Sequence, residues 1–307
     1  MNSMLQNILK RKISNLHIPS SDDKIKFYCI REVLQEIVLY SLYNTGFFNY
    51  AAFYGGTSLR LFHDLERFSE DLDFCIYKNS IDFDFSYYIN EAEKIIRTFC
   101  LPIQIDIKEK SKASNIKTSL LKANKREVYI LFALNESSIH RNENIKIKIE
   151  LDMTPFKYHN TLTTFKSEYF PYHIQICDLP TLFAGKIHAI LCRNWKSGRV
   201  KGRDLFDYVF FSSRKCSINL QYLQEKLVFS GFIAQDTHLT IELVQDFLKE
   251  KFKSIEYNEA RKDVDQFVFN PYLTNAWSPD FFCFLARDLK ADAPEEENTS
   301  EGLSPSL

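Results

Sequence analysis

The sequence lacks several features that would place the protein in a specialised class. Its seven cysteines include no CxxC pair and show no regular spacing, which argues against a structural zinc site or a disulfide framework. No apolar run approaches the roughly 20 residues that span a bilayer, and residues 1–12 are polar and basic, unlike the start of a secretory signal. These absences predict a reduced, cytoplasmic protein with no membrane segment.

An excess of charge of one sign is also missing. The 39 Lys and Arg residues nearly balance the 40 Asp and Glu residues, for a net charge of −1, so no overall positive field is available to hold nucleic acid. A polyanion would have to bind at local basic patches, and the candidates are Lys122, Lys125 and Arg126, and Lys196, Arg199, Lys201 and Arg203. Solvated loops are the simpler interpretation of both patches.

The composition is that of an ordinary globular protein, and the order of predicted elements changes near residue 178. Before it, helices are predicted at 24–43, 57–66 (with Thr57 as the N-cap) and 86–99, and strands at 47–54, 71–77, 102–107, 127–134 and 145–153. After it, helices are predicted at 181–193, 203–211, 220–229, 239–252 and 279–289. We therefore expect an α+β protein. A mixed-sheet domain of residues 1–177 with flanking helices would precede a helical domain of residues 178–290, and an acidic tail of residues 291–307 should be disordered.

The most informative stretch is FYGGTSLRLFHDLERFSEDLDFCIY, residues 53–77. Its glycine pair allows a backbone to approach a phosphate closely, and the start of the following helix favours an anion. Asp71 and Asp73 then lie two residues apart on a predicted strand, so their side chains share a face about 7 Å apart at Cα. Carboxylates at that spacing can converge on Mg²⁺. A polar solvent face would explain an isolated DxD, but the glycine turn one helix earlier favours a triphosphate site.

Other charged residues occupy positions that a solvated face explains less well. Glu150 and Asp152 lie on the polar face of an alternating strand, and either could supply a third acid. Lys186 lies on the apolar stripe of a predicted helix with Arg193 on the same face, where the lysine either snorkels to the surface or reaches a phosphate. Asp204 and Asp207 are neighbours on the next helix, so one of them could pair with Lys186.

These motifs together resemble the AbiEii/AbiGii-type nucleotidyltransferase toxins, which include the MenT proteins and belong to the DNA polymerase β-like superfamily. The resemblance rests on GGTSLR, RFSEDLDF, the IKIE strand, and K-x-x-A followed by RD-x-x-D, and covers roughly residues 25 to 215. It implies a nucleotide-binding turn at Gly55, Gly56, Thr57 and Ser58, metal-binding carboxylates at Asp71 and Asp73, and an essential lysine at Lys186. The last motif aspartate falls on Asp204 or Asp207, of which Asp204 is preferred. Arg67 and Ser69 match the first motif and would support the metal strand.

The resemblance further implies a Mg²⁺- or Mn²⁺-dependent enzyme that uses an NTP as its substrate. Its active site would lie in the cleft between the sheet and the helical domain. Asp71 and Asp73 would hold the metal, Glu150 would take a proton from the acceptor, and Lys186 would neutralise the triphosphate. Such toxins transfer nucleotides to RNA, particularly to the 3′ end of tRNA, block translation, and have a separately encoded antitoxin.

Three alternatives remain open from the sequence. The acceptor could be a small molecule instead of RNA, or it could be a protein. The chain could also be a non-catalytic nucleotide-binding module, although the presence of both carboxylates, Lys186 and the RD pair argues against that.

Overall fold

The computed structural model describes residues 2–16, 23–78, 83–108, 115–135, 139, 143–193 and 201–292. Three predictions fall outside these residues: the basic positions Lys196 and Arg199, and the disordered tail from residue 293 onward.

Within the described residues, seven strands form one mixed sheet in the order β3-β4-β5-β2-β1-β7-β6. The strands are β1 (Ala51–Tyr54), β2 (Leu72–Ile76), β3 (Ile103–Lys108), β4 (Ile116–Asn124), β5 (Asn144–Asp152), β6 (Thr161–Lys166) and β7 (Tyr172–Cys177). The central strand β2 runs antiparallel to β1 and parallel to β5, and β1 runs parallel to β7. The middle of the sheet is therefore made of segments far apart in the sequence.

Side-chain alternation gives the two faces of this sheet different partners. Phe74, Ile149 and Ile176 belong to one buried apolar cluster, which also contains residues of α1 (Asn2–Asn15), α2 (Asp23–Asn44) and α4 (Phe85–Arg97). Cys75 and Cys177 belong instead to a second cluster on the other face. Because side chains alternate along a strand, Asp73 and Glu150 project toward that second face.

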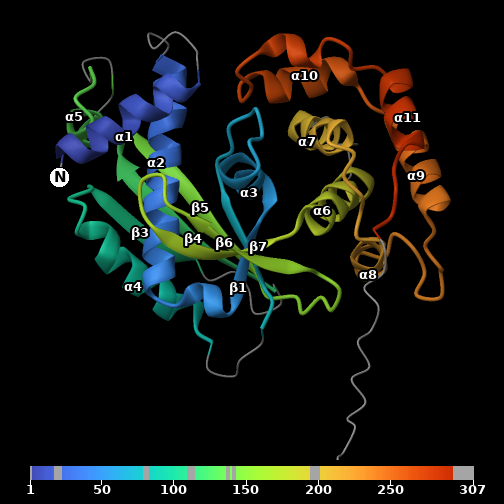
Figure 1. Ribbon diagram of the computed structural model, residues 1–307, viewed down its shortest axis with the longest axis horizontal. Coiled ribbons are helices and arrows are strands. Elements are labelled where there is room, and N and C mark those ends of the chain that lie inside the picture. The colour runs from blue at the N-terminus through green and yellow to red at the C-terminus, as the bar shows by residue number, and fades with distance from the viewer. Residues whose placement is uncertain are drawn as a thin grey trace, which may run out of the picture.

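The second cluster is completed by the helices that follow the sheet, which Figure 1 shows grouped on the opposite side of α3 (Gly55–Phe62) from α2. They are α6 (Leu179–Cys192), α7 (Gly202–Ser213), α8 (Leu220–Phe229), α9 (Ile241–Lys253), α10 (Tyr257–Asp265) and α11 (Pro279–Arg287). Phe183 of α6 stacks on Phe211 of α7 with ring centroids 4.5 Å apart. Helix α6 also packs against α8, so it lies between α7 and α8.

The α+β class and the mixed sheet are confirmed, but several local predictions were wrong. Residues 127–131 of the strand expected at 127–134 belong to helix α5 (Lys125–Leu131), whose first turn is capped by the Asn124 side chain accepting from the Glu127 amide. The strand expected at 47–54 begins as a 3₁₀ turn, Phe47–Asn49, and only Ala51–Tyr54 pair in the sheet. The described helices include none long and apolar enough to cross a membrane.

The helix after the glycine pair also starts earlier than expected. Thr57 does not cap it, because α3 already begins at Gly55 and its N-cap residue, Tyr54, makes no side-chain cap bond. The Thr57 hydroxyl instead donates a hydrogen bond to the backbone carbonyl of Asp71. This bond ties the first turn of α3 to the segment that carries the two aspartates.

Candidate active site

The glycine turn brings the start of α3 against the aspartate strand. Gly55 has a φ of +83°, which L side chains rarely adopt, and a Cβ there would lie 2.5 Å from Oδ2 of Asp73. At Gly56, a Cβ would lie 2.7 Å from Nη2 of Arg67. Both positions therefore need glycine for close approach, and the first residue of α3 lies beside the Asp73 carboxylate.

Two further carboxylates lie close to Asp73. Asp71 immediately precedes β2, and Glu150 of β5 is the direct cross-strand partner of Asp73. Burial, reinforced by the negative charge of Asp71, raises the pKa of Asp73 to about 7. Burial and the neighbouring Glu70 likewise raise the pKa of Asp71. These carboxylates thus repel one another in a poorly hydrated place, which a bound cation would relieve.

The donor set fits a magnesium ion that shares its coordination with a substrate. In the part of the chain that the structure describes, no group of three or more His, Cys, Asp or Glu residues is placed to hold a metal by itself. Mg²⁺, however, is commonly held by one or two carboxylates together with substrate phosphates and water. Asp71 and Asp73 satisfy that requirement, whereas Oε2 of Glu150 lies 2.6 Å from the Lys148 ammonium and is already paired.

Lys186 is held by an ion network beneath the site. Its Nζ lies 2.7 Å from Oδ2 of Asp207 and 3.7 Å from Oδ1 of Asp204. Arg67 donates two hydrogen bonds of 2.7 Å to the Asp207 carboxylate, and Arg193 pairs with Asp204. Burial alone would raise the pKa of Asp207, but the charges of Arg67 and Lys186 outweigh it and hold that pKa below its usual value. The sequence left the partner of Lys186 open between the two aspartates, and the structure places Asp207 nearer.

A pocket of about 280 Å³ collects these groups where the sheet meets the helices. Its walls include Gly55, Asp73, Glu150, Lys186, Arg193 and Asp204. The side chains of Thr57, Ser58 and Asp207 are fully buried behind it, so Thr57 and Ser58 offer backbone and not hydroxyl groups to a ligand. The Lys186 side chain retains 15% of its exposure, enough for its ammonium to face the pocket.

Several wall residues had no signal in the sequence motifs. Tyr54 precedes the glycine pair, His188 follows Lys186 on α6, and Tyr222 and Lys226 come from α8. The four-residue spacing of Tyr222 and Lys226 puts them on one helical face, but only tertiary packing shows that this face meets the aspartate strand.

Comparisons with known proteins show similarity in sequence pattern and in fold. The pattern that defines the family described as nucleotidyl transferase AbiEii toxin, type IV TA system, matches residues 37–284. The fold is similar to that of MenT4, a nucleotidyltransferase toxin from Mycobacterium tuberculosis, at 16% identity and a TM-score of 0.53, over 95% of this chain and 91% of that one. It is also similar to JHP933 from Helicobacter pylori, at 18% identity and a TM-score of 0.46, over 84% and 89% of the two chains. No curated protein matches the sequence.

The family match confirms the resemblance seen in the sequence and extends it. It begins within α2, includes the glycine turn, both aspartates, Lys186 and the RD pair, and continues to residue 284 in α11, well past residue 215 where recognisable motifs end. The chain therefore belongs to the AbiEii nucleotidyltransferase toxin family.

Proposed function

We propose that this toxin-type nucleotidyltransferase is Mg²⁺-dependent and transfers a nucleotide from an NTP to RNA, with the 3′ end of tRNA as the acceptor. The observation that carries the proposal is that Asp73 and Lys186 line the same pocket, with the Asp71 carboxylate near enough to Asp73 to raise its pKa. Neighbouring carboxylates can hold the metal ion, and a fixed ammonium in the same pocket complements the negative charge of the triphosphate.

Binding of the NTP is assigned to three groups. Asp71 and Asp73 would hold Mg²⁺, or Mn²⁺, which when bound neutralises phosphate charge and makes the attacking hydroxyl more acidic. Gly55, the first residue of α3, lines the same pocket, and free backbone amides at a helix start would attract phosphate oxygens. Lys186, fixed by Asp207, presents a positive charge that needs little reorganisation during the reaction.

The chemical step requires only one bond to form and one to break. The acceptor's hydroxyl oxygen attacks the α-phosphorus, the bond from that phosphorus to the β-phosphate oxygen breaks, and pyrophosphate leaves. Glu150 is assigned the proton from the acceptor hydroxyl, because it lies directly across from Asp73 and lines the pocket. Asp152 is the weaker candidate, because it lies opposite Cys75 and is not among the described residues that line the pocket.

An RNA acceptor is supported by basic side chains at the entrance to the pocket. The Arg193 side chain is 41% exposed although it pairs with Asp204. Lys201 is exposed. Partial burial and the charges of Arg193 and Arg203 lower its pKa, whereas Asp263 and Asp71 act against that shift, so these charged groups lie near it. Cations beside the metal-binding aspartates suit the phosphates that flank a terminal nucleotide. A compact small-molecule acceptor would not need such a rim.

The biological role follows from the acceptor. A nucleotide added to the 3′ end of tRNA prevents aminoacylation, so translation stops and growth with it. The protein would act in the cytoplasm, where tRNA and NTPs are present, and a separately encoded antitoxin would counteract it.

An acceptor competition tests this proposal. Purified protein is incubated with Mg²⁺ and each α-³²P-labelled NTP in turn, together with total tRNA, total protein or aminoglycosides. We expect label on tRNA, and we expect it to disappear when the tRNA 3′-terminal diol has been oxidised with periodate. Label that persists on oxidised tRNA, or that accumulates on protein or on aminoglycosides, would contradict the RNA 3′-end assignment.

A further inference from the structure

One end of the pocket contains charged and polar groups that the proposed chemistry does not use. Helix α6 lies between α7, which carries Asp204 and Asp207, and α8, which carries Tyr222 and Lys226. The phosphate-binding groups therefore occupy the α7 side, and the α8 side forms a separate wall of the same pocket.

Lys226 is an unusual cation because its charge has no carboxylate partner within ion-pair distance among the described residues. Its ammonium instead lies 4.4 Å from the ring centroid of Phe156 and 5.3 Å from that of Tyr222. Burial lowers the pKa of Lys226, although the negative charge of Asp152 acts against that shift. An ammonium held on aromatic faces at a pocket wall retains donors for a ligand.

His188 adds a second unused group on the same wall. Its Nε2 atom is buried and has no hydrogen-bond partner in the described part of the structure. Burial, reinforced by the charges of Lys226 and Arg193, lowers the pKa of His188 to about 4, although a hydrogen bond with the Lys226 backbone acts against that shift. The imidazole is therefore neutral at pH 7. Buried polar atoms in native proteins are normally satisfied, and a ligand in the pocket would satisfy this one.

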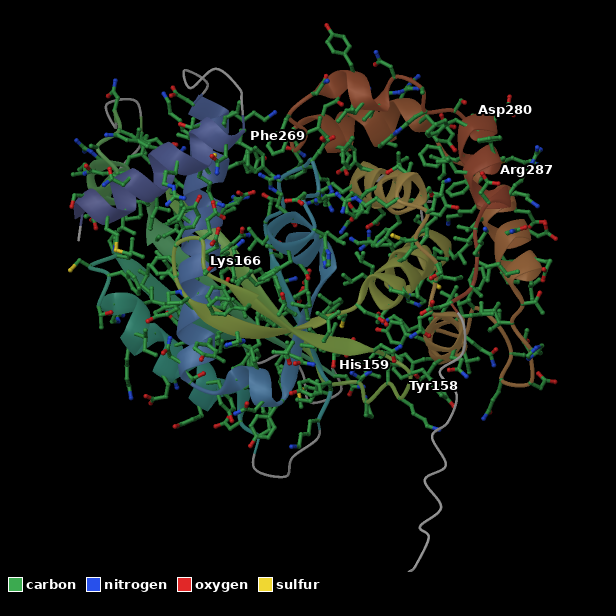
Figure 2. All side chains as sticks on the ribbon, in the orientation of Figure 1. Tyr158, His159, Lys166, Phe269, Asp280 and Arg287 are labelled. Atoms are coloured by element: carbon green, nitrogen blue, oxygen red, sulfur yellow. The ribbon has the colours of Figure 1, made fainter. Side chains whose placement is uncertain are left out.

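The wall is held in place by the loop between β5 and β6. The Asn219 side chain donates a 2.7 Å hydrogen bond to the Tyr158 carbonyl, and Glu225 accepts from the Lys157 amide at 2.9 Å. Figure 2 shows Tyr158 and His159 next to α8. The Phe156 ring beneath Lys226 belongs to this anchored loop, so the ammonium has a fixed position.

We propose that Lys226 and His188, with the Tyr222 ring, form the subsite for the base of the NTP, and that Lys226 donates a hydrogen bond to an exocyclic carbonyl oxygen of that base. This inference rests on the proposed function, because it places the triphosphate at Asp73 and Lys186. A neutral imidazole next to one ammonium suits the polar edge of an aromatic ring better than another phosphate, which would favour several cations.

The chemistry of the four bases makes the proposal specific. Guanine, uracil and cytosine each carry a carbonyl oxygen, whereas adenine offers an amino group and ring nitrogens. The Lys226 ammonium can only donate, and an ammonium placed to reach an exocyclic oxygen would face the amino group of adenine, which is also a donor, or lie farther from its ring nitrogens, which do not project beyond the ring. The subsite should therefore bind CTP, UTP and GTP as a group more tightly than ATP, by about tenfold or more for a hydrogen bond with a charged donor.

The test measures binding of the four NTPs, as non-hydrolysable analogues with Mg²⁺, and of inorganic tripolyphosphate to the full-length protein. Lys226→Met keeps the buried stem and removes only the charge and its donors. We expect the wild-type protein to disfavour ATP about tenfold or more, and the variant to lose that preference while binding tripolyphosphate as before. His188→Leu should weaken the preferred NTPs and leave tripolyphosphate unaffected. Lys249→Met, on α9 where the partly exposed lysine pairs with the exposed Asp246, is the matched control and should change nothing.

The other outcomes separate this inference from the proposed function. If Lys226→Met weakens tripolyphosphate and all four NTPs equally, Lys226 contacts phosphate and the base subsite is wrong. If the wild-type protein binds the four NTPs equally and neither variant changes that, the subsite is also wrong while the proposed function stands. If the wild-type protein binds neither NTP nor tripolyphosphate, both fail together.

Discussion

At the scale of single residues, Asp207 is the group on which the arrangement of the site most depends. It is fully buried and neutralises two cations, Arg67 and Lys186, that come from different parts of the fold. Arg67 reaches it from the segment between α3 and β2, and Lys186 from α6. A buried charge that loses its partner is far more costly than the pair is stabilising.

Asp207→Asn should therefore destabilise the protein by about 3–5 kcal/mol, because it leaves Arg67 and Lys186 buried with no negative charge between them. Urea unfolding of the variant at pH 7 measures the effect. Asp246→Asn, on an exposed face of α9, is the control and should change the free energy of unfolding by less than about 0.5 kcal/mol. A loss of the same small size in both variants would show that the network does not contribute to folding.

The same residue predicts a dependence of stability on pH. The pKa of Asp207 is lower in the folded protein than its ordinary value of 3.8, so its contribution is complete above that value. It disappears as the pH falls through the lowered pKa of the folded state. Unfolding measured from pH 7 to pH 3 should show wild-type stability falling more steeply below about pH 4 than that of Asp207→Asn. If the free energies of unfolding of the two proteins fell in parallel below pH 4, the stabilising role assigned to the ionised Asp207 would be wrong.

At the scale of secondary-structure elements, the start of α3 is where backbone geometry and chemistry meet. Gly55→Ala would put a methyl group 2.5 Å from Oδ2 of Asp73 and impose a positive φ on alanine. We expect it to abolish nucleotide transfer and to lower stability by at least about 1 kcal/mol.

Gly185 provides the matched comparison within α6. It has open space around its Cβ position, so Gly185→Ala should raise stability by about 0.5–1 kcal/mol through helix propensity alone. Thermal melting of the two variants checks both expectations. A stable, active Gly55→Ala protein would show that the turn does not need to approach Asp73.

The elements also show which parts of the fold could be predicted from sequence. Strands β2 and β5 were expected close to their observed positions, because each alternates cleanly between apolar and polar residues. Strand β4 was missed, since its buried positions are Thr118, Ser119, Leu121 and Ala123, which give only a weak hydrophobic pattern. It forms because it completes the hydrogen bonds of both β3 and β5.

The strand predicted in place of helix α5 was wrong for a different reason. Val128, Tyr129 and Ile130 favour a strand locally, but Asn124 three residues before Glu127 is an N-cap signal that was available in the sequence.

Among the site residues, the aspartates and Lys186 were predictable because they occur in short motifs. The wall formed by α8 was not predictable, because Lys226 and Asp73 line one pocket only through packing of segments about 150 residues apart in the sequence.

At the scale of the whole molecule, the site lies where the second face of the sheet meets the helices that follow it. One cluster supports the sheet from the side of α2 and α4, and the other joins the opposite face of the sheet to α6–α11. The carboxylates come from the sheet, and the phosphate-facing cations come from the helices. Neither part holds a complete site, which agrees with a family match that spans both.

The central claim is that Asp71 and Asp73 support metal-dependent transfer of a nucleotide. The most direct test measures transfer of label from an α-³²P-labelled NTP to tRNA by the wild-type protein, by Asp73→Asn and by Asp280→Asn, each with Mg²⁺ and with EDTA. Figure 2 shows Asp280 on α11 at the outer edge of the molecule, which makes it the matched control.

We predict that EDTA abolishes transfer by all three proteins. With Mg²⁺, Asp280→Asn should match the wild-type rate, and Asp73→Asn should be slower by about 100-fold or more. Asp73→Asn should melt at or above the wild-type temperature, because it removes the repulsion from Asp71. A folded Asp73→Asn protein that transfers label at the wild-type rate would contradict the account.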